Sequence, residues 1–343
     1  MTTTVRPAPA LPSLAALEAA AATVYAAMPP TPQYRWPLLE ARTGVETWVK
    51  HENHTPVGAF KIRGGLVHLA RLAAAGGRAR VPGVVTATRG NHGQSVGFAA
   101  LRHGIPALVV VPRGNGRDKN AAMRALGVEL VEAGDDFQAA IEAADALAVE
   151  RGWYRLPSFH PDLVAGVGTY ALELFRATAA AGAALDTVYV PIGLGSGACG
   201  VLAAKAALGA RAEVVGVVSA HAPAYARSLA GGRAESHPAT TVLADGMACR
   251  TPVAEALALL RGEGGGPGLA RVVEVTDAEV AGAMRALFED THNAAEGAGA
   301  AALAALLQER ERRPEFVRGR RVAVVLCGGN VDAEVFGRVL GRA

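Results

Sequence analysis

Cysteines are scarce in this sequence and are placed far apart. Cys199, Cys249 and Cys327 are the three cysteines among 343 residues, and none of them forms a CxxC pair. An odd number of widely spaced cysteines argues against a disulfide framework and against a structural zinc site. A cytoplasmic location is therefore our default expectation.

Long apolar segments and an excess of charge of one sign are also absent. Gly, Pro or a charged residue interrupts every apolar run before it reaches the ~18 to 20 residues that cross a bilayer. The N-terminus carries Arg6, three prolines and Glu18 where a secretory signal would be apolar. The 34 basic and 31 acidic residues are spread along the chain. We expect a soluble protein with no targeting segment, no membrane partner and no nucleic-acid partner.

Lysine is rare as well, whereas glycine is abundant. The sequence has four lysines, Lys50, Lys61, Lys119 and Lys205, so chemistry that needs a lysine amine has few candidate positions. Glycine makes up 41 of 343 residues, about 12% against the usual ~7%. Much of the excess lies in short loops after apolar runs, where glycine lets the backbone approach a ligand closely.

The hydrophobic fraction of 51% permits a sizeable core and rules out general disorder. Short β-rich runs alternate with Ala- and Leu-rich segments of helical period. The expected strands are 47–50, 83–87, 107–111, 129–132, 187–192, 213–218 and 322–326. The expected helices are 64–75, 93–102, 119–126, 137–151, 166–180 and 198–207, with an Ala-rich helix within 1–30. This alternation predicts an α/β fold with a mostly parallel sheet, whose ligands bind at strand-to-helix turns.

One such turn follows the expected strand 187–192 and is rich in glycine. Its residues are Gly193, Leu194, Gly195, Ser196 and Gly197. Closely spaced glycines let successive backbone N–H groups converge on an anion, so the turn predicts a phosphate-binding loop. The run 195–200 also fits GxGxxG, but the next strand continues into Ser219, Ala220 and His221. A dinucleotide site needs an acidic residue there, so NAD is a minor alternative.

Lys61 lies in a second turn, just before an apolar helix. A lysine in apolar surroundings loses hydration and its pKa falls, which suits it to Schiff-base formation and proton transfer. A solvated lysine at a helix start is the plainer interpretation, but the helix dipole opposes positive charge there.

A third turn at 86–94 offers backbone amides, a hydroxyl and a carboxamide to a small anion, although Asn91 is equally suited to cap the following helix. Cys327 follows the expected strand 322–326 and on its own would be an inert buried thiol. The histidines show no metal-ligand spacing and no GxSxG motif occurs, which excludes zinc and serine hydrolases.

Four motifs together resemble the pyridoxal-phosphate-dependent serine/threonine dehydratase family, in their order as well as their spacing. They are Phe60–Gly64, Gly90–Gln94, Gly193–Gly197 and Cys327–Asn330. The resemblance covers about residues 31–332, with further matches at 161–166, 243–246 and 296–300. It implies a tryptophan-synthase-β-like fold with two open twisted parallel-sheet domains. The large domain would comprise 1–85 and 158–343, and a small mobile domain would comprise 86–157.

The resemblance also implies roles for individual residues. Lys61 would bind the aldehyde of pyridoxal 5'-phosphate as a Schiff base, Phe60 would lie beside the ring, and Asn91 would contact the ring hydroxyl. Cys327 would face the pyridine nitrogen. The glycine loop Gly193–Gly197 would hold the phosphate. The substrate carboxylate would bind to Thr88, Arg89, Gly90, Asn91 and His92.

The implied reaction is β-elimination of water from a threonine- or serine-like 3-hydroxy amino acid, which gives a 2-oxo acid and ammonia. A neutral thiol opposite the pyridine nitrogen makes the ring a weaker electron sink than a carboxylate would, which favours elimination. Two alternatives stay open: β-replacement of the cysteine-synthase type, and a non-catalytic sensor of amino acid or cofactor. The identity of the 3-hydroxy amino acid and the assembly, for which a homodimer is one candidate, are also open.

Three departures from the family narrow these expectations. Arg89 stands where relatives with racemase activity carry a serine as second base, which argues against racemisation. Residues 217–224 lack the acidic ligands of relatives that bind a divalent cation, so we predict no metal. The chain ends at Ala343, which leaves no room for the regulatory domain of biosynthetic threonine deaminases.

Overall fold

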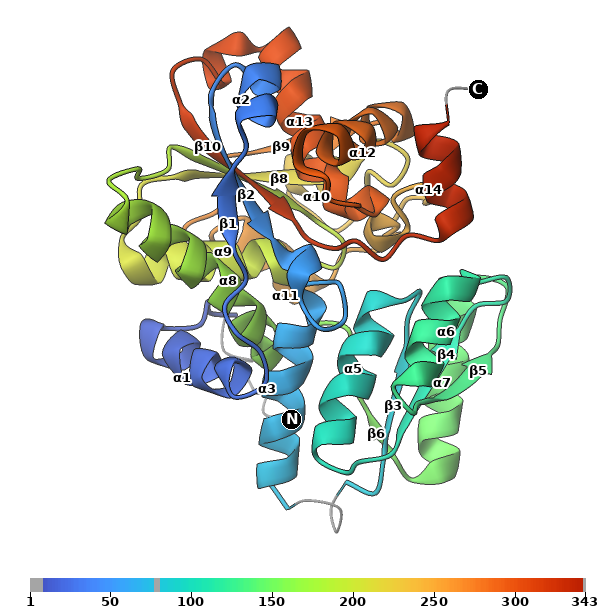
Figure 1. The fold of residues 1–343 in the computed structure, drawn as a ribbon. Coiled ribbons are helices and arrows are strands. Elements are labelled where there is room, and N and C mark those ends of the chain that lie inside the picture. Colours follow the sequence, from blue (N-terminus) through green and yellow to red (C-terminus); the bar gives the residue numbers. More distant parts are fainter. Residues whose placement is uncertain (1–8, 77–80, 342–343) are drawn as a thin grey trace.

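The computed structural model describes residues 9–76 and 81–341, and it contains two β-sheets in separate parts of the molecule (Figure 1). The larger sheet has six strands in the order β1-β2-β10-β7-β8-β9, and the smaller has four in the order β5-β4-β3-β6. Strand β1 pairs with β2 in antiparallel fashion, and the other pairs in the two sheets are parallel. The predicted parallel α/β class is confirmed.

The strands of the larger sheet are β1 (Gln33–Arg35), β2 (Glu46–His51), β7 (Thr187–Pro191), β8 (Glu213–Ser219), β9 (Arg271–Val275) and β10 (Arg321–Leu326). Those of the smaller sheet are β3 (Val84–Ala87), β4 (Ala107–Val111), β5 (Glu129–Glu132) and β6 (Tyr154–Arg155). Every residue of the central strands β3, β4 and β7 is buried. This is the continuous apolar pattern expected of parallel strands covered on both faces.

The helices are α1 (Leu14–Tyr25), α2 (Pro37–Thr43), α3 (Lys61–Ala74), α5 (Asn91–Arg102), α6 (Arg117–Ala125), α7 (Phe137–Arg151), α8 (Pro161–Ala180), α9 (Ser196–Leu208), α10 (Ala224–Gly231), α11 (Ala254–Leu260), α12 (Asp277–Thr291), α13 (Gly297–Arg312) and α14 (Ala333–Leu340). Short 3₁₀ turns lie at η1 (Glu52–His54), η2 (Asp245–Met247) and η3 (Pro314–Phe316). No helix within the described ranges combines the length and the apolar character needed to cross a membrane.

The predicted elements match these bounds closely in the first two thirds of the chain. Strands β4 and β5 and helix α7 have the predicted limits. Helices α3 and α8 begin three and five residues earlier than predicted (64 − 61 and 166 − 161). Of the N-terminal segment, α1 occupies 14–25, and residues 1–8 lie outside the described part. The pattern predicts no element between residues 219 and 321, but the structure has β9 and α10 to α13 there.

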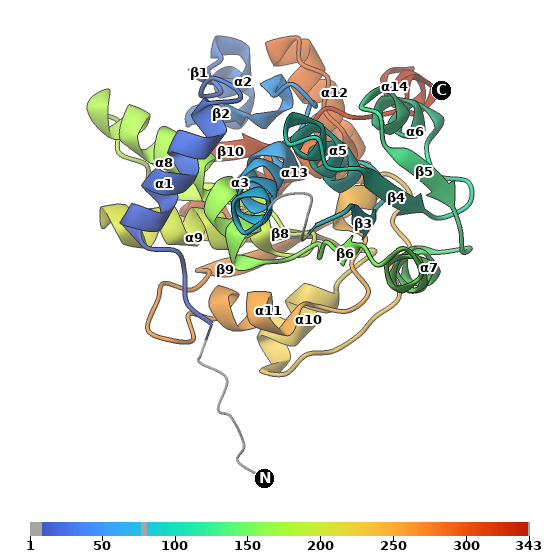
Figure 2. The same cartoon turned by 90° about the horizontal axis from the view of Figure 1, so that it is seen from below.

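The smaller sheet is covered on both faces, with α5 and α6 on one side and α7 on the other (Figure 2). Side chains alternate between the faces, because successive strand residues point to opposite sides. Val84 and Val109 pack in the same core as α3 and α5, whereas Val85 and Leu108 pack against α7. This sheet uses residues 84–155, close to the predicted small domain, although the domain boundaries and the mobility stay predictions.

Helices α3 and α8 approach each other backbone to backbone. A Cβ added at Gly166 would collide with the carbonyl oxygen of Arg63, and one at Gly64 would lie 3.0 Å from the carbonyl oxygen of Leu163. Moving either helix away would open a gap in the core. The absence of a side chain at the two glycines therefore sets the distance between the helices. That spacing fixes the direction of α3, whose first residue is Lys61.

We predict that Gly166→Ala destabilises the protein by about 1–3 kcal/mol, because the added methyl group forces α3 and α8 apart. Denaturant unfolding at equilibrium measures this change. Gly337→Ala is the matched control, because a Cβ at Gly337 in α14 meets nothing within 4 Å. For Gly337→Ala we expect the free energy of unfolding to rise by about 0.5–1 kcal/mol, because alanine loses less conformational freedom than glycine when the helix forms. Equal effects at both positions would contradict the close-packing argument.

Candidate active site

Lys61 is the first residue of α3, rather than a residue of the turn before it as predicted. The turn is attached to the end of β10, since Phe60 N donates to Cys327 O at 3.0 Å and Ala59 pairs with Gly328. The Lys61 Nζ lies 5.1 Å from the centroid of the Phe60 ring. Two motifs from opposite ends of the chain therefore meet at this amine.

Burial controls the protonation of the groups around Lys61. It lowers the pKa of Lys61, and the nearby Cys327 and Glu296 offset this only in part. Burial also raises the pKa of Cys327 well above its usual value, so its thiol stays neutral. The site thus holds an amine that gives up its proton more easily than a solvated lysine, beside a neutral sulfur donor.

The glycine loop follows β7 and leads into α9. Gly195 has φ +98°, a left-handed conformation that suits glycine, and a Cβ at Gly193 would collide with the carbonyl oxygen of Gly246. The Tyr225 hydroxyl donates to Leu194 O at 2.9 Å and fixes the loop from behind. A Cβ at Gly197 would lie 3.6 Å from the Phe60 ring, so the loop borders the Lys61 site. A backbone cradle in front of a helix N-terminus fits a phosphate group.

Asn91 does not cap α5, so the alternative interpretation of Asn91 as a helix cap is wrong. Gly90 occupies the cap position, and Asn91 is the first helical residue. Its Nδ2 donates to Glu296 Oε1 at 2.5 Å, and its Oδ1 accepts from Asn330 Nδ2 at 2.8 Å. Asn91 therefore points toward the residues that follow β10 and toward the start of α13.

Two buried nitrogen atoms, one in the turn before α5 and one in its first turn, lack partners. Arg89 Nε and His92 Nε2 have no hydrogen-bond partner among the residues that the structure describes. Burial, together with the charges of Lys61, Arg155 and His68, lowers the pKa of His92 to about 3 and keeps its ring neutral. Inside the same turn, Gly90 N donates to Thr88 Oγ1 at 3.0 Å. An unsatisfied buried guanidinium N–H fits an anionic ligand, which would supply the missing acceptor.

Three charged residues complete the site: Lys119, Asp245 and Glu296. The sequence patterns alone assigned none of them a role. Lys119 Nζ lies 2.5 Å from Asp245 Oδ2, and both charges act on Glu296. Burial raises the pKa of Glu296 to about 7, although Lys119 and the hydrogen bond from Asn91 oppose this. The family resemblance could have identified two of them, since Asp245 lies in the match at 243–246 and Glu296 in the match at 296–300.

Polar contacts also join the loops of the smaller sheet to the larger part of the molecule. Besides the Lys119–Asp245 pair and the Asn91–Glu296 hydrogen bond, Arg250 Nη1 lies 3.0 Å from Asp136 Oδ2. The site thus lies where the two parts face each other, as the predicted two-domain fold requires.

The residues present fit pyridoxal phosphate. They comprise an amine of lowered pKa, an aromatic ring beside it, a backbone cradle for a phosphate, a neutral thiol, and a donor-rich turn for a carboxylate. Contacts of Phe60 with Cys327, of Gly197 with Phe60 and of Asn91 with Asn330 bring the four motifs together.

Comparisons with known proteins agree with this arrangement. The family model described as "Pyridoxal-phosphate dependent enzyme" matches residues 24–328. The L-threonine ammonia-lyase of Thermotoga maritima is 34% identical over 306 residues, which cover 89% of this chain and 72% of that protein. The biosynthetic L-threonine dehydratase of Salmonella typhimurium is 33% identical, and the match covers 91% of this chain but 58% of that protein. The chain thus spans less than two thirds of the biosynthetic relative's length.

Among solved structures, a threonine deaminase from the organism abbreviated T.th. has a TM-score of 0.84 and 32% identity. The match covers 94% of this chain and 99% of that one. The resemblance inferred from the motifs and the predicted fold class are confirmed. The chain belongs to the family of pyridoxal-phosphate dependent enzymes, and pyridoxal phosphate is its cofactor.

Proposed function

We propose that this protein is a dehydratase, or ammonia-lyase, that removes water from a threonine- or serine-like 3-hydroxy amino acid. Its products would be a 2-oxo acid and ammonia. The observation that carries the proposal is the partly buried Lys61 amine of lowered pKa, which lies between two anion-binding turns. The names of the relatives support the same reaction class. A homodimer and a cytoplasmic location stay predictions.

The proposed cofactor contacts follow from the positions of the side chains. Lys61 would hold the cofactor covalently, the glycine loop its phosphate, Asn91 its ring hydroxyl and Cys327 its pyridine nitrogen, with Phe60 beside the ring. When bound, the cofactor draws electrons away from the α-carbon of the amino acid. The remaining chemistry then depends on residues that place the substrate and move protons.

Lys61 would act as the base that takes the α-proton once the substrate amine has displaced it from the cofactor. Its lowered pKa raises the fraction of free amine near neutral pH, which general-base catalysis requires. The turn at Thr88–His92 binds the substrate carboxylate through its backbone amides and its unpartnered Arg89 and His92 nitrogens. Loss of the β-hydroxyl as water leaves an enamine, which water converts to the 2-oxo acid and ammonia.

Cys327 and Glu296 are the buried groups that interact electrostatically with Lys61. The thiol of Cys327 is neutral because burial raises its pKa, so it donates or accepts one weak hydrogen bond without adding charge. Glu296 accepts the hydrogen bond from Asn91 and thereby orients the carboxamide. Glu296, from the larger part of the molecule, would thus hold Asn91 in the orientation that contacts the ring hydroxyl.

The experiment that tests the function is a substrate panel with the holoenzyme. Threonine, serine, 3-hydroxyaspartate and bulkier 3-hydroxy amino acids are supplied singly, and ammonia and 2-oxo acid are measured together. We expect equal amounts of the two products from at least one substrate. Product formation only when a thiol is added would indicate β-replacement. Spectral changes without any product would indicate a sensor.

We predict that Lys61→Ala abolishes ammonia release and the borohydride-reducible attachment of the cofactor together, since the amine serves both purposes. Reduction with borohydride followed by mass spectrometry measures the attachment. Lys205→Ala is the control, because Lys205 lies near the end of α9 and is expected to leave both readouts unchanged. A reducible cofactor linkage that persists in Lys61→Ala would contradict the assignment.

We predict that Arg89→Ala lowers kcat/KM by about 10-fold or more, because a hydrogen bond to a charged group contributes about 1.5–3 kcal/mol. Steady-state kinetics with every accepted substrate measures this effect. Arg89→Lys keeps the charge and should recover part of the activity. A kcat/KM within about twofold of the wild type, less than ~0.5 kcal/mol of transition-state binding, would show that Arg89 does not contact the substrate.

We predict that Cys327→Ser retains elimination, since a hydroxyl makes the same neutral hydrogen bond. Cys327→Asp should place a negative charge opposite the pyridine nitrogen, keep that nitrogen protonated and slow turnover by about 10-fold or more, equal to about 1.4 kcal/mol of barrier. Absorbance spectra and turnover rates are compared for both variants. Unchanged spectra and rates in Cys327→Asp would show that residue 327 does not face the ring nitrogen.

A further inference from the structure

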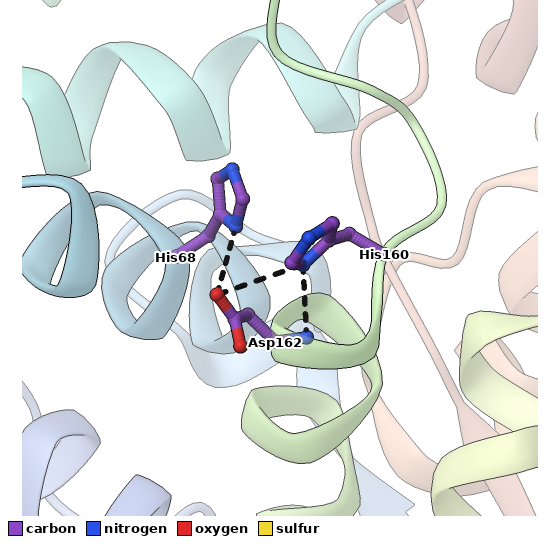
Figure 3. Close-up of side chains that lie close together, drawn as sticks. All are labelled: His68, His160 and Asp162. Carbon is purple, nitrogen blue, oxygen red and sulfur yellow. Dashed lines mark hydrogen bonds and ion pairs between the residues drawn. The ribbon is translucent and has the colours of Figure 1, made fainter. Parts of the chain in front are cut away.

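A second cluster of titratable side chains lies outside the candidate active site, where α3 meets the start of α8. It consists of His68, His160 and Asp162, and one ligand atom of each lies within 4.8 Å of the others (Figure 3). His68 and Asp162 are buried, and the His160 side chain is 36% exposed. His68 lies 94 positions before Asp162, so the spacing of residues in the sequence gave no hint of the cluster.

Two of the three separations match those between ligands of one metal ion. The His68 Nδ1 lies 3.1 Å from Asp162 Oδ2, and the His160 Nδ1 lies 3.5 Å from the same oxygen (Figure 3). Two ligands at ~2.1 Å from a tetrahedral zinc ion lie about 3.4 Å apart. A divalent ion could therefore sit among these three atoms after small side-chain shifts, and its fourth position would face His160 and solvent.

The partners of the three residues resemble the outer contacts of known metal sites. The Tyr154 hydroxyl contacts His68 Nε2 at 3.2 Å, which fixes the orientation of the ring. Arg71 pairs with Asp162 Oδ1 and leaves Oδ2 directed at the two imidazoles. Ligating histidines and carboxylates are commonly held in this way by a second hydrogen-bonded group.

The hydrogen bonds of His160 show that its ring offers a lone pair. The His160 Nδ1 accepts from Asp162 N at 3.1 Å, and a metal ion would replace this donor.

Arg71 is the feature that opposes metal binding, because its positive charge repels a cation. Its side chain is 52% exposed, however, so water screens the charge and the guanidinium can move outward. The scaffold below the cluster is rigid, since α3 and α8 are in backbone contact at Gly64 and Gly166. A preformed cluster of this kind loses little conformational freedom on binding.

We propose that His68, His160 and Asp162 form a binding site for one Zn²⁺ or a similar transition-metal ion. The ion would join α3, which begins with Lys61, to the segment that leaves β6 and enters α8. Each imidazole donates one nitrogen lone pair and Asp162 one oxygen, and a water molecule completes the tetrahedron. The ring proton of His68 then lies on Nε2, where the Tyr154 hydroxyl oxygen accepts it. The site is separate from residues 217–224, where some relatives bind a divalent cation.

The test is a calorimetric titration of the holoenzyme with ZnCl₂ in a buffer that does not bind zinc. We expect one ion per chain, and about 100-fold or greater loss of affinity in His68→Gln and in Asp162→Asn, since even loss of an outer contact weakens metal sites by about 10- to 100-fold. Both substitutions keep the shape of the side chain. Circular dichroism and cofactor absorbance confirm that the variants are folded and loaded.

His103→Gln is the matched control, because His103 is an exposed histidine at the end of α5 and should leave zinc affinity unchanged. Tyr154→Phe provides a graded variant, with an expected loss of about 10-fold from the missing outer contact. Zinc affinity that is the same in the wild type, His68→Gln and Asp162→Asn would overturn the proposal. Absence of measurable zinc binding to the wild type would also overturn it and leave the cluster a hydrogen-bond network.

Discussion

Arg63 is completely buried two residues after Lys61, and its guanidinium holds together the segments that surround the candidate active site. It binds Glu52 at 2.7 Å and Glu173 at 2.6 Å, which attach η1 and α8 to α3. The two carboxylates outweigh burial and raise the pKa of Arg63, so it stays charged. Lys50 from β2 also contacts Glu173, and two cations therefore balance two anions. Removing one member would leave a buried unpaired charge, which costs about 3–5 kcal/mol.

This network explains how Lys61 is held in position at the start of α3. Hydrophobic packing fixes the distance between α3 and α8 at their glycines, but packing alone permits a helix to rotate or slide. The directed hydrogen bonds of a planar guanidinium define one rotation of α3 about its axis. The first residue of that helix, Lys61, then faces the end of β10 and the glycine loop.

Local patterns in the sequence were sufficient to predict the parallel α/β class, most strands, and the turns that meet at the site. These patterns did not predict features that depend on a contact between residues far apart in the sequence. Asn91 has a residue type that caps helices, yet its partners Glu296 and Asn330 come from elements more than two hundred positions away. Helix α8 begins at Pro161 behind His160, whose ring nitrogen caps it, and histidine is not a typical capping residue. Helix α12 did carry a local signal, the capping box of Thr276 and Glu279, which the apolar pattern did not include.

The polar contacts between the two parts of the molecule differ in their surroundings, and this gives them unequal responses to dissolved salt. The Arg250–Asp136 pair lies on the surface, with both side chains at least half exposed, so counterions weaken it within ordinary ionic strengths. The Lys119–Asp245 pair and the Asn91–Glu296 hydrogen bond are largely shielded from water and keep their strength. Ionic strength consequently loosens the rim of the interface before it affects the contacts beside the cofactor.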